Sequence, residues 1–187
     1  MGLQNFLARW STQTHTFIIS FREISYSLED VATQFHLPLF GDENVQSLTA
    51  SPEEKLMNTA LIKSLKASNV GSARATFSSW IKYHFGSAVD EKKCLLDFEK
   101  GKGFKPKLNL AAFIAFWLSR YVFPCLLVDG VNRSLFMLAI KISKGDRFYL
   151  APLFVGSLYK RLDLYKRSME AFLGHNYVLC FVDTAAL

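Results

Sequence analysis

The chain has 187 residues, of which 50% are hydrophobic and 20% are charged, and it carries a formal net charge of +6 with a sequence pI of about 9.2. This composition excludes an intrinsically disordered chain, and the length suits one domain with a substantial core. The three cysteines, Cys94, Cys125 and Cys180, are odd in number and widely spaced. They argue against a disulfide framework and favour a reducing compartment.

The segment near the N-terminus predicts strand, then helix, then turn. Residues 16–26 contain an apolar, β-branched run that alternates with polar residues, which is typical of one or two short strands. Ser27 stands three residues before Asp30, in the arrangement of a capping box, and so predicts the start of a helix. Pro38 biases the residue before it away from helical geometry and marks the end of that segment.

Three further helices and a loop are expected between residues 51 and 107. Ser51, Pro52 and Glu54 supply an N-cap, a helix-starting proline and an acidic third residue. A second stripe of apolar residues follows at 77–85 and stops at Gly86. We expect a shorter helix at 91–98 and, from the glycine and proline content, a loop at 101–107.

Residues 110–123 are the most apolar stretch, and we expect them to form a central core helix, capped by Asn109 and ended by Pro124. The uninterrupted apolar run, 110–118, is much shorter than the roughly 20 residues that cross a bilayer, so a membrane span is not favoured. Arg120 must reach solvent or pair with a carboxylate, because an unpaired buried guanidinium is costly. A structural ion pair is favoured over an anion pocket.

The C-terminal part predicts two more helices. Ser134 is a candidate cap for the first, and Pro152 is expected to bend or break any helix that contains it. The second carries an apolar stripe made of Leu158, Leu162, Tyr165 and Met169. Residues 177–182 are an apolar run that suits strand or helix. The chain then stops without a helix terminator, as expected of a domain shortened at its C-terminus.

Four segments together resemble the plant mobile domain family, which occurs in transposon-encoded proteins and in host genes derived from them, including the MAIN-like proteins. They are THTF (14–17), SLEDVATQFHLPLFG (27–41), FIAFWLSRYVFP (113–124) and LAPLFVGSLYKRLDLYK (150–166). The commonest family pattern has a bulky aliphatic pair and a glycine where Gln34, Phe35 and His36 stand here. These motifs specify a fold more than a chemistry.

The resemblance also implies a biological setting. In host-encoded relatives it implies a nuclear role in transposable-element silencing and in gene expression or genome maintenance. A phosphatase-like nuclear protein is the partner that it implies.

Motifs that carry chemistry are missing from the sequence. The histidines His15, His36, His84 and His175 lack metal-ligand spacing, and we expect His84 to be a hydrogen-bonded core residue. There is no nucleophile elbow, phosphate loop or dinucleotide fingerprint. The acidic residues Glu29, Asp30, Asp42 and Glu43 suit capping and turn formation better than a two-metal nuclease site. We therefore expect no catalytic residue, no metal and no cofactor.

The charge pattern gives the one functional hint that comes from the residues. Across residues 141–167 the only acids are Asp146 and Asp163. The bases there are Lys141, Lys144, Arg147, Lys160, Arg161, Lys166 and Arg167. Such a stretch can attract nucleic-acid phosphates. The alternative is a solvated helix face on which Asp163 pairs with Arg167 at i,i+4.

We therefore predict a single, mainly α-helical globular domain, residues 1–187, packed around the central helix, with minor β structure near the N-terminus. The first functional hypothesis is a non-catalytic interaction module with a protein partner and no membrane association. The second is a DNA- or RNA-binding domain that uses the seven bases. The third is an enzyme whose site is assembled from residues distant in sequence. The oligomeric state stays open.

Overall fold

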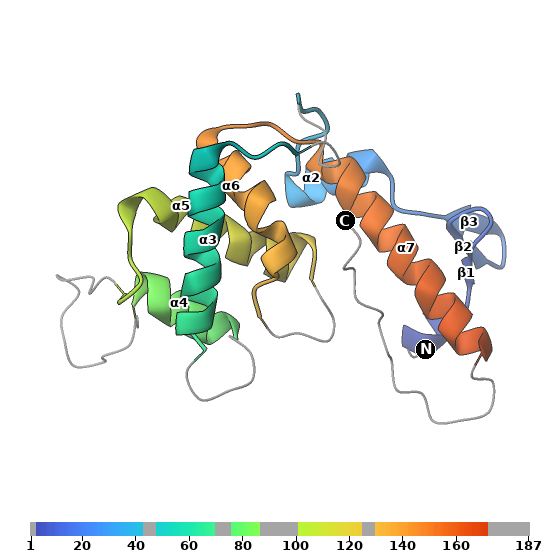
Figure 1. The fold of residues 1–187 in the computed structure, drawn as a ribbon. Helices are drawn as coiled ribbons and strands as arrows, with labels where there is room; N and C mark the ends of the chain where they lie inside the picture. Colours follow the sequence, from blue (N-terminus) through green and yellow to red (C-terminus); the bar gives the residue numbers. More distant parts are fainter. Residues whose placement is uncertain (1–2, 43–47, 70–75, 87–100, 125–129, 172–187) are drawn as a thin grey trace, which may run out of the picture. The chain divides into compact units, whose positions relative to one another are not determined.

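The computed structural model describes residues 3–42, 48–69, 76–86, 101–124 and 130–171 (Figure 1). Over these ranges the protein is mainly α-helical with one small antiparallel sheet near the N-terminus, which confirms the predicted fold class. The predicted helix at 91–98, the run at 177–182 and the three cysteines lie outside the described residues.

Contacts within the chain define two compact units. Unit 1 comprises Met1–Asp42 and Phe148–Thr184, and unit 2 comprises Glu43–Arg147 and Ala185–Leu187. Whether they behave as the single domain expected from the sequence stays a prediction.

Unit 1 contains the sheet. Helix α1 (Leu3–Leu7) is followed by β1 (Trp10–Ser11), β2 (Thr16–Ile19) and β3 (Arg22–Ile24), which pair antiparallel in that order. Trp10 lies opposite Phe17, and Phe17 lies opposite Ile24. Trp10 and Phe17 are buried with their ring centroids 4.9 Å apart, so this cross-strand pair supplies the apolar face of the sheet.

Two helices complete unit 1. Helix α2 (Leu28–Phe35) begins with the predicted capping box, in which Ser27 and Asp30 satisfy each other's backbone N–H groups. Helix α7 (Leu150–Ala171) packs against α2, β1 and α1 (Figure 1). The expectation that Pro152 bends or breaks this helix is wrong. Pro152 is its third residue, and the first-turn N–H groups of a helix lack an intrahelical partner in any case.

In unit 2, α3 (Pro52–Ala67) starts with the predicted capping box of Ser51 and Glu54. Helix α4 (Phe77–Phe85) is capped by Thr76 and ends at Gly86 as expected, and α6 (Phe136–Lys144) ends at Gly145. The predicted cap for α6 is wrong. Asn132, and not Ser134, accepts the capping hydrogen bond, and it starts a short 3-10 turn, η3 (Arg133–Leu135), that leads into α6.

The central apolar helix starts earlier than predicted. Helix α5 (Pro106–Trp117) begins with Pro106 at its first position, so Asn109 lies inside it and does not cap it. From Leu118 the chain widens into a π-helical turn, η2 (Leu118–Val122), which ends before Pro124. The hydroxyl of Ser119 in this turn donates to the carbonyl of Ala115 and accepts the N–H of Asn132. These bonds tie the end of the helix to the segment before α6.

Small side chains let α5 pack closely in the centre of unit 2, against α6, α4 and α3. Ala111, Ala112 and Ala115 are fully buried, and the indole nitrogen of Trp80 in α4 donates to the carbonyl of Ala112 over 3.1 Å. The expectation of burial all round is wrong, however, because Leu110 and Phe113 on the other side are 55% and 51% exposed. The helix is a core element with one open apolar face.

None of the described helices has both the length and the apolar character needed to cross a bilayer.

Candidate interaction surfaces

The open face of α5 carries a continuous row of aromatic rings. Phe85 of α4 lies 6.2 Å from Phe113, which lies 6.4 Å from Phe116, which lies 6.3 Å from Tyr121, all between ring centroids. Phe113 and Tyr121 are 51% and 58% exposed, and the other two rings are half-buried. We name these four residues the aromatic row.

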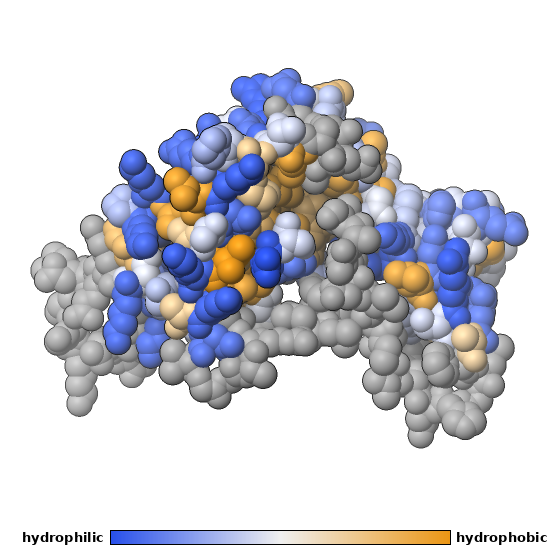
Figure 2. All heavy atoms as spheres, viewed as in Figure 1, coloured by the Kyte–Doolittle hydropathy of each residue, from blue (hydrophilic) through white to orange (hydrophobic). Residues whose placement is uncertain are grey.

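Aliphatic side chains extend the apolar surface beyond the rings. Leu110 lies one turn before Phe113 on the same face of α5, and Ile81 is partly exposed on the neighbouring helix α4. On the side of unit 2 seen in Figure 2, hydrophobic residues lie among hydrophilic ones. An exposed apolar surface bordered by polar groups is typical of a site where another macromolecule binds.

Arg120 lies at one end of the aromatic row. Its guanidinium carbon is 5.2 Å from the ring centroid of Phe77 and 6.0 Å from that of Tyr121, and the side chain is exposed. These distances are those of a cation–π contact. Arg120 therefore reaches solvent, and its guanidinium lies against aromatic surface; the ion pair expected from the sequence stays a prediction.

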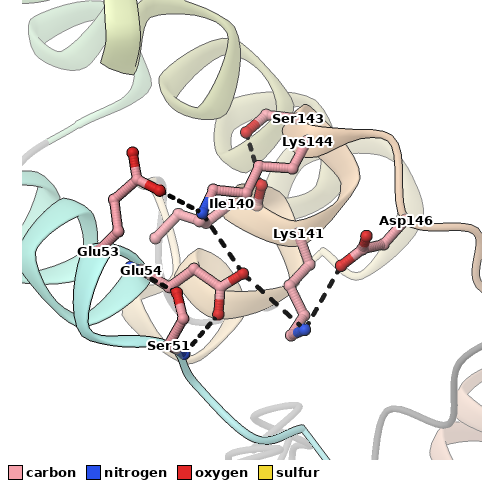
Figure 3. Close-up of polar contacts among 8 residues, drawn as sticks. All are labelled: Ser51, Glu53, Glu54, Ile140, Lys141, Ser143, Lys144 and Asp146. Atoms are coloured by element: carbon pink, nitrogen blue, oxygen red, sulfur yellow. Dashed lines mark hydrogen bonds and ion pairs between the residues drawn. The ribbon is translucent and has the colours of Figure 1, made fainter.

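The seven predicted bases fall in two sets. Lys141, Lys144 and Arg147 lie in unit 2, and the other four lie on α7 in unit 1. Figure 3 shows Lys141 and Lys144 converging on Glu54 of α3. Lys141 is buried, with its Nζ 3.9 Å from Glu54 Oε1 and 3.4 Å from Asp146 Oδ2. This lysine holds helices together in the core and is not presented to a ligand.

The same carboxylates hold Lys144, whose Nζ lies 3.1 Å from Glu53 Oε2 and 3.6 Å from Glu54 Oε1. The hydrogen bond to Glu53 raises the pKa of Lys144. The backbone N–H of Ser51 and then the two lysines lower the pKa of Glu54. Glu54 thus serves at once as a helix cap and as the anion of a partly buried ion cluster.

On α7 the four bases differ in their surroundings. Lys166 donates to the carbonyl of Ala8 over 2.6 Å and pairs with Glu170, and Arg161 bonds the carbonyl and hydroxyl of Ser157. Lys160 and Arg167 are exposed and make no hydrogen bond or ion pair with any residue in the described ranges. They are seven positions apart, so both lie on one face of the helix.

Asp163 has different partners from the one considered from the sequence. Its Oδ1 accepts from Trp10 Nε1 over 2.8 Å and its Oδ2 lies 3.2 Å from His15 Nε2, so the alternative pairing with Arg167 is wrong. The imidazole of His15 also stacks on Tyr159, with centroids 5.3 Å apart. Sequence reasoning missed this cluster because its members are about 150 positions apart and no local spacing signals it.

A comparison with family models matches residues 3–182 of the chain to the plant mobile domain. The chain belongs to this transposon-associated family. No curated protein and no solved structure matches it.

One departure from the commonest plant mobile domain pattern has a physical meaning. His36, which stands where that pattern has glycine, is the C-cap of α2 and has a φ of 53°, in the left-handed region. A residue with a side chain is strained there, whereas glycine adopts this conformation freely. A glycine at this position would therefore relieve strain at the end of α2.

His84 lies in the core of unit 2, as predicted, and is fully buried, with its ring 4.4 Å from that of Trp80. The expectation of a hydrogen-bonded ring stays a prediction. Among the described residues neither nitrogen has a partner of hydrogen-bond geometry. Burial lowers the pKa of His84 to about 4, the nearby carbonyl of Gly103 opposes the shift, and Lys105 adds to it. The ring is therefore neutral near pH 7.

Of the acidic residues weighed as a metal site, Glu29 and Asp30 lie in the first turn of α2. Asp30 caps α2, and its hydrogen bonds with Ser27 lower its pKa. Glu43 lies outside the described residues. Within the described ranges no three His, Cys, Asp or Glu side chains lie close enough to share a metal ion.

Proposed function

We propose that this plant mobile domain is a non-catalytic protein-interaction module. The observation that carries the proposal is the exposed aromatic row with Leu110, because covering such a surface with a partner removes apolar area from water. The polar clusters support it as well. Glu54 caps α3 and joins it to α6 in unit 2, and Asp163 joins α7 to Trp10 and His15 in unit 1, so both clusters have structural roles.

The proposal includes a biological setting. Membership of a transposon-associated family supports a nuclear role in transposable-element silencing and in gene expression or genome maintenance. The partner we propose is a phosphatase-like nuclear protein, as in the host-encoded relatives that the sequence resembles.

Co-expression of the domain with that phosphatase-like protein tests the proposal. We expect one complex that survives gel filtration and whose mass, from light scattering, equals a sum of the two chains. Separate elution of both proteins would contradict it. The double variant Lys160→Gln/Arg167→Gln is the matched control, because its changes are exposed and lie in unit 1, and it should form the same complex.

A second candidate function is nucleic-acid binding by the basic residues of α7. The specific observation in its favour is that Lys160 and Arg167 are exposed, lie on one helix face and have no partner among the described residues. This candidate predicts that DNA or RNA affinity falls steeply with salt. Two lost phosphate contacts in Lys160→Gln/Arg167→Gln should reduce the slope of log affinity against log salt by about 2.

Fluorescence anisotropy with labelled duplex DNA and single-stranded RNA, at low and physiological salt, decides between the two. The control is Lys144→Gln, which removes a base already paired with Glu53 and should leave the slope unchanged. If Lys160→Gln/Arg167→Gln binds nucleic acid as the parent does, the second candidate is wrong.

A further inference from the structure

The described segments that carry the aromatic row are rich in basic residues. Residues 76–86 and 101–124, which form α4, the loop before α5, α5 and η2, contain no Asp or Glu. They contain five exposed bases, Lys82, Lys102, Lys105, Lys107 and Arg120. The four lysines make no ion pair with any residue in the described ranges. A partner that covers this surface gains most if it is acidic.

The bases border both ends of the apolar surface. Lys107 lies one turn before Leu110 on α5, and Arg120 contacts the ring of Tyr121 at the far end. From Leu110 to Tyr121 the chain advances eleven positions, about 16 Å at the rise of a helix. That length matches about three turns of a second helix laid along the first.

The side chains favour a protein over a nucleic acid. Stacking platforms for single-stranded nucleic acids offer aromatic faces on which successive bases lie. Here the rings of Phe85 and Phe113 are inclined at 90°, and those of Phe116 and Tyr121 at 89°, so successive faces are not parallel. Leu110, which is 55% exposed, has an aliphatic side chain, on which a nucleobase cannot stack. Mixed aliphatic and aromatic side chains at helical spacing suit the apolar face of a partner helix.

We propose that the aromatic row and Leu110 bind an acidic amphipathic helix of a partner protein. The leucine or phenylalanine face of that helix covers the row, and its glutamates or aspartates approach Lys107 and the neighbouring bases. This inference rests on the proposed function and specifies the partner for the same surface.

The test uses the full chain and a labelled synthetic peptide of about 16 residues, with Leu at i, i+3, i+4 and i+7 positions and Glu on the flanks. Its matched control is the same peptide with Lys in place of Glu. We expect anisotropy titrations to give an affinity at least about tenfold higher for the acidic peptide, and the difference to narrow as salt rises.

Variants locate the binding surface. Phe113→Ser and, separately, Leu110→Gln should each weaken binding of the acidic peptide by about tenfold, and Lys107→Gln by a few-fold. Phe21→Ser, at an 87% exposed position in unit 1, should leave binding unchanged. Because Phe113 and Leu110 are more than half exposed, both variants should keep the circular dichroism and melting curve of the parent. Should Phe113→Ser unfold, Leu110→Gln carries the comparison.

Three results would overturn the inference. Equal affinity for the two peptides would show that the partner need not be acidic. Unchanged affinity in both Phe113→Ser and Leu110→Gln would show that the peptide binds at another surface. Competition by a short single-stranded oligonucleotide that depends on Phe113 would make the row a nucleic-acid surface. In the first two cases, a complex between the domain and the phosphatase-like protein would still support the proposed function. If instead the acidic peptide binds as expected but no complex with the phosphatase-like protein forms, the proposed partner is wrong and the peptide-binding surface stands.

Discussion

Trp10 donates a hydrogen bond of 2.8 Å from its indole nitrogen to Oδ1 of Asp163, and so joins the first strand to the last described helix across 153 positions of the chain. Trp10 is 2% exposed, and its ring also packs on Phe17 and Tyr159. A buried N–H that loses its acceptor retains its full desolvation cost. This hydrogen bond therefore holds β1 against α7 in unit 1, a contribution separate from those of helix capping and apolar packing.

Two replacements of Asp163 should distinguish the contribution of its hydrogen bond to stability from the contribution of its charge. We expect Asp163→Ala to lower the free energy of unfolding by about 2 kcal/mol, because Trp10 then has a buried donor without an acceptor. Asp163→Asn keeps an acceptor oxygen for Trp10, so its free energy of unfolding should fall by less. Urea unfolding followed by tryptophan fluorescence measures both. Arg167→Ala, on the exposed side of the same helix, is the control and should change little, while equal losses in the two Asp163 variants would contradict the role of the hydrogen bond.

Glycine in place of His36, at the C-terminal end of α2, should stabilise the protein. His36 has a φ of 53°, so His36→Gly relieves strain at the helix C-terminus and should raise the free energy of unfolding by about 1 kcal/mol. The matched control is Gln34→Gly, inside the same helix, which should lower it by a similar amount. A loss of stability in His36→Gly, measured by urea unfolding, would contradict the strain inferred at this position.

In the ion cluster of unit 2, loss of the acid Glu54 should lower the free energy of unfolding more than loss of the base Lys141. Glu54→Ala removes a helix cap and leaves Lys141 buried beside a single acid, so we expect a loss of about 3 kcal/mol. Lys141→Met keeps the buried methylene chain, and Glu54 still has Ser51 and Lys144 as partners. It should therefore cost less than about 1 kcal/mol. Thermal and urea unfolding measure the difference, and the reverse order of losses would contradict the assignment.

Acid should destabilise unit 2 through His84. Its pKa is about 4 in the fold against an ordinary value of 6.5, so the folded state favours the neutral ring. The corresponding stability is fully present above pH 6.5, declines as the pH falls toward 4, and amounts to about 3 kcal/mol over that interval.

Urea unfolding at pH 7 and at pH 4.5 tests this effect. The parent should lose markedly more stability between the two pH values than His84→Leu, which has no group to protonate at that position. Equal losses in the two proteins would show that other groups cause the acid sensitivity.

Local signals in the sequence predicted the local structure well. The boxes formed by Ser27 with Asp30 and by Ser51 with Glu54 each need only four consecutive residues, and both are present. Pro106 is an equally local signal for the start of α5, but the glycine and proline content of residues 101–107 predicts a loop there. The long-range partners of Asp163 could not be predicted, since helical spacing offered Arg167 and carried no information about Trp10 or His15.

The candidate surface escaped prediction for a related reason. Composition shows that α5 is apolar all round, and such a helix is expected to be buried all round. Which side stays open depends on how α4 and α6 pack, and the small residues Ala111, Ala112 and Ala115 draw those neighbours to one side. Leu110 and Phe113 are left exposed on the other. The sequence identified the right helix but not its free face.

The central claim is that the domain binds protein through the open face of α5. Its most direct test measures the affinity of the phosphatase-like nuclear protein for the parent domain, for Phe113→Ser and for Lys160→Gln/Arg167→Gln, all by titration calorimetry in one buffer. The claim predicts tight binding by the parent, at least about tenfold weaker binding by Phe113→Ser, and parent-like binding by the α7 variant. Parent-like binding by Phe113→Ser together with a large loss in the α7 variant would contradict it.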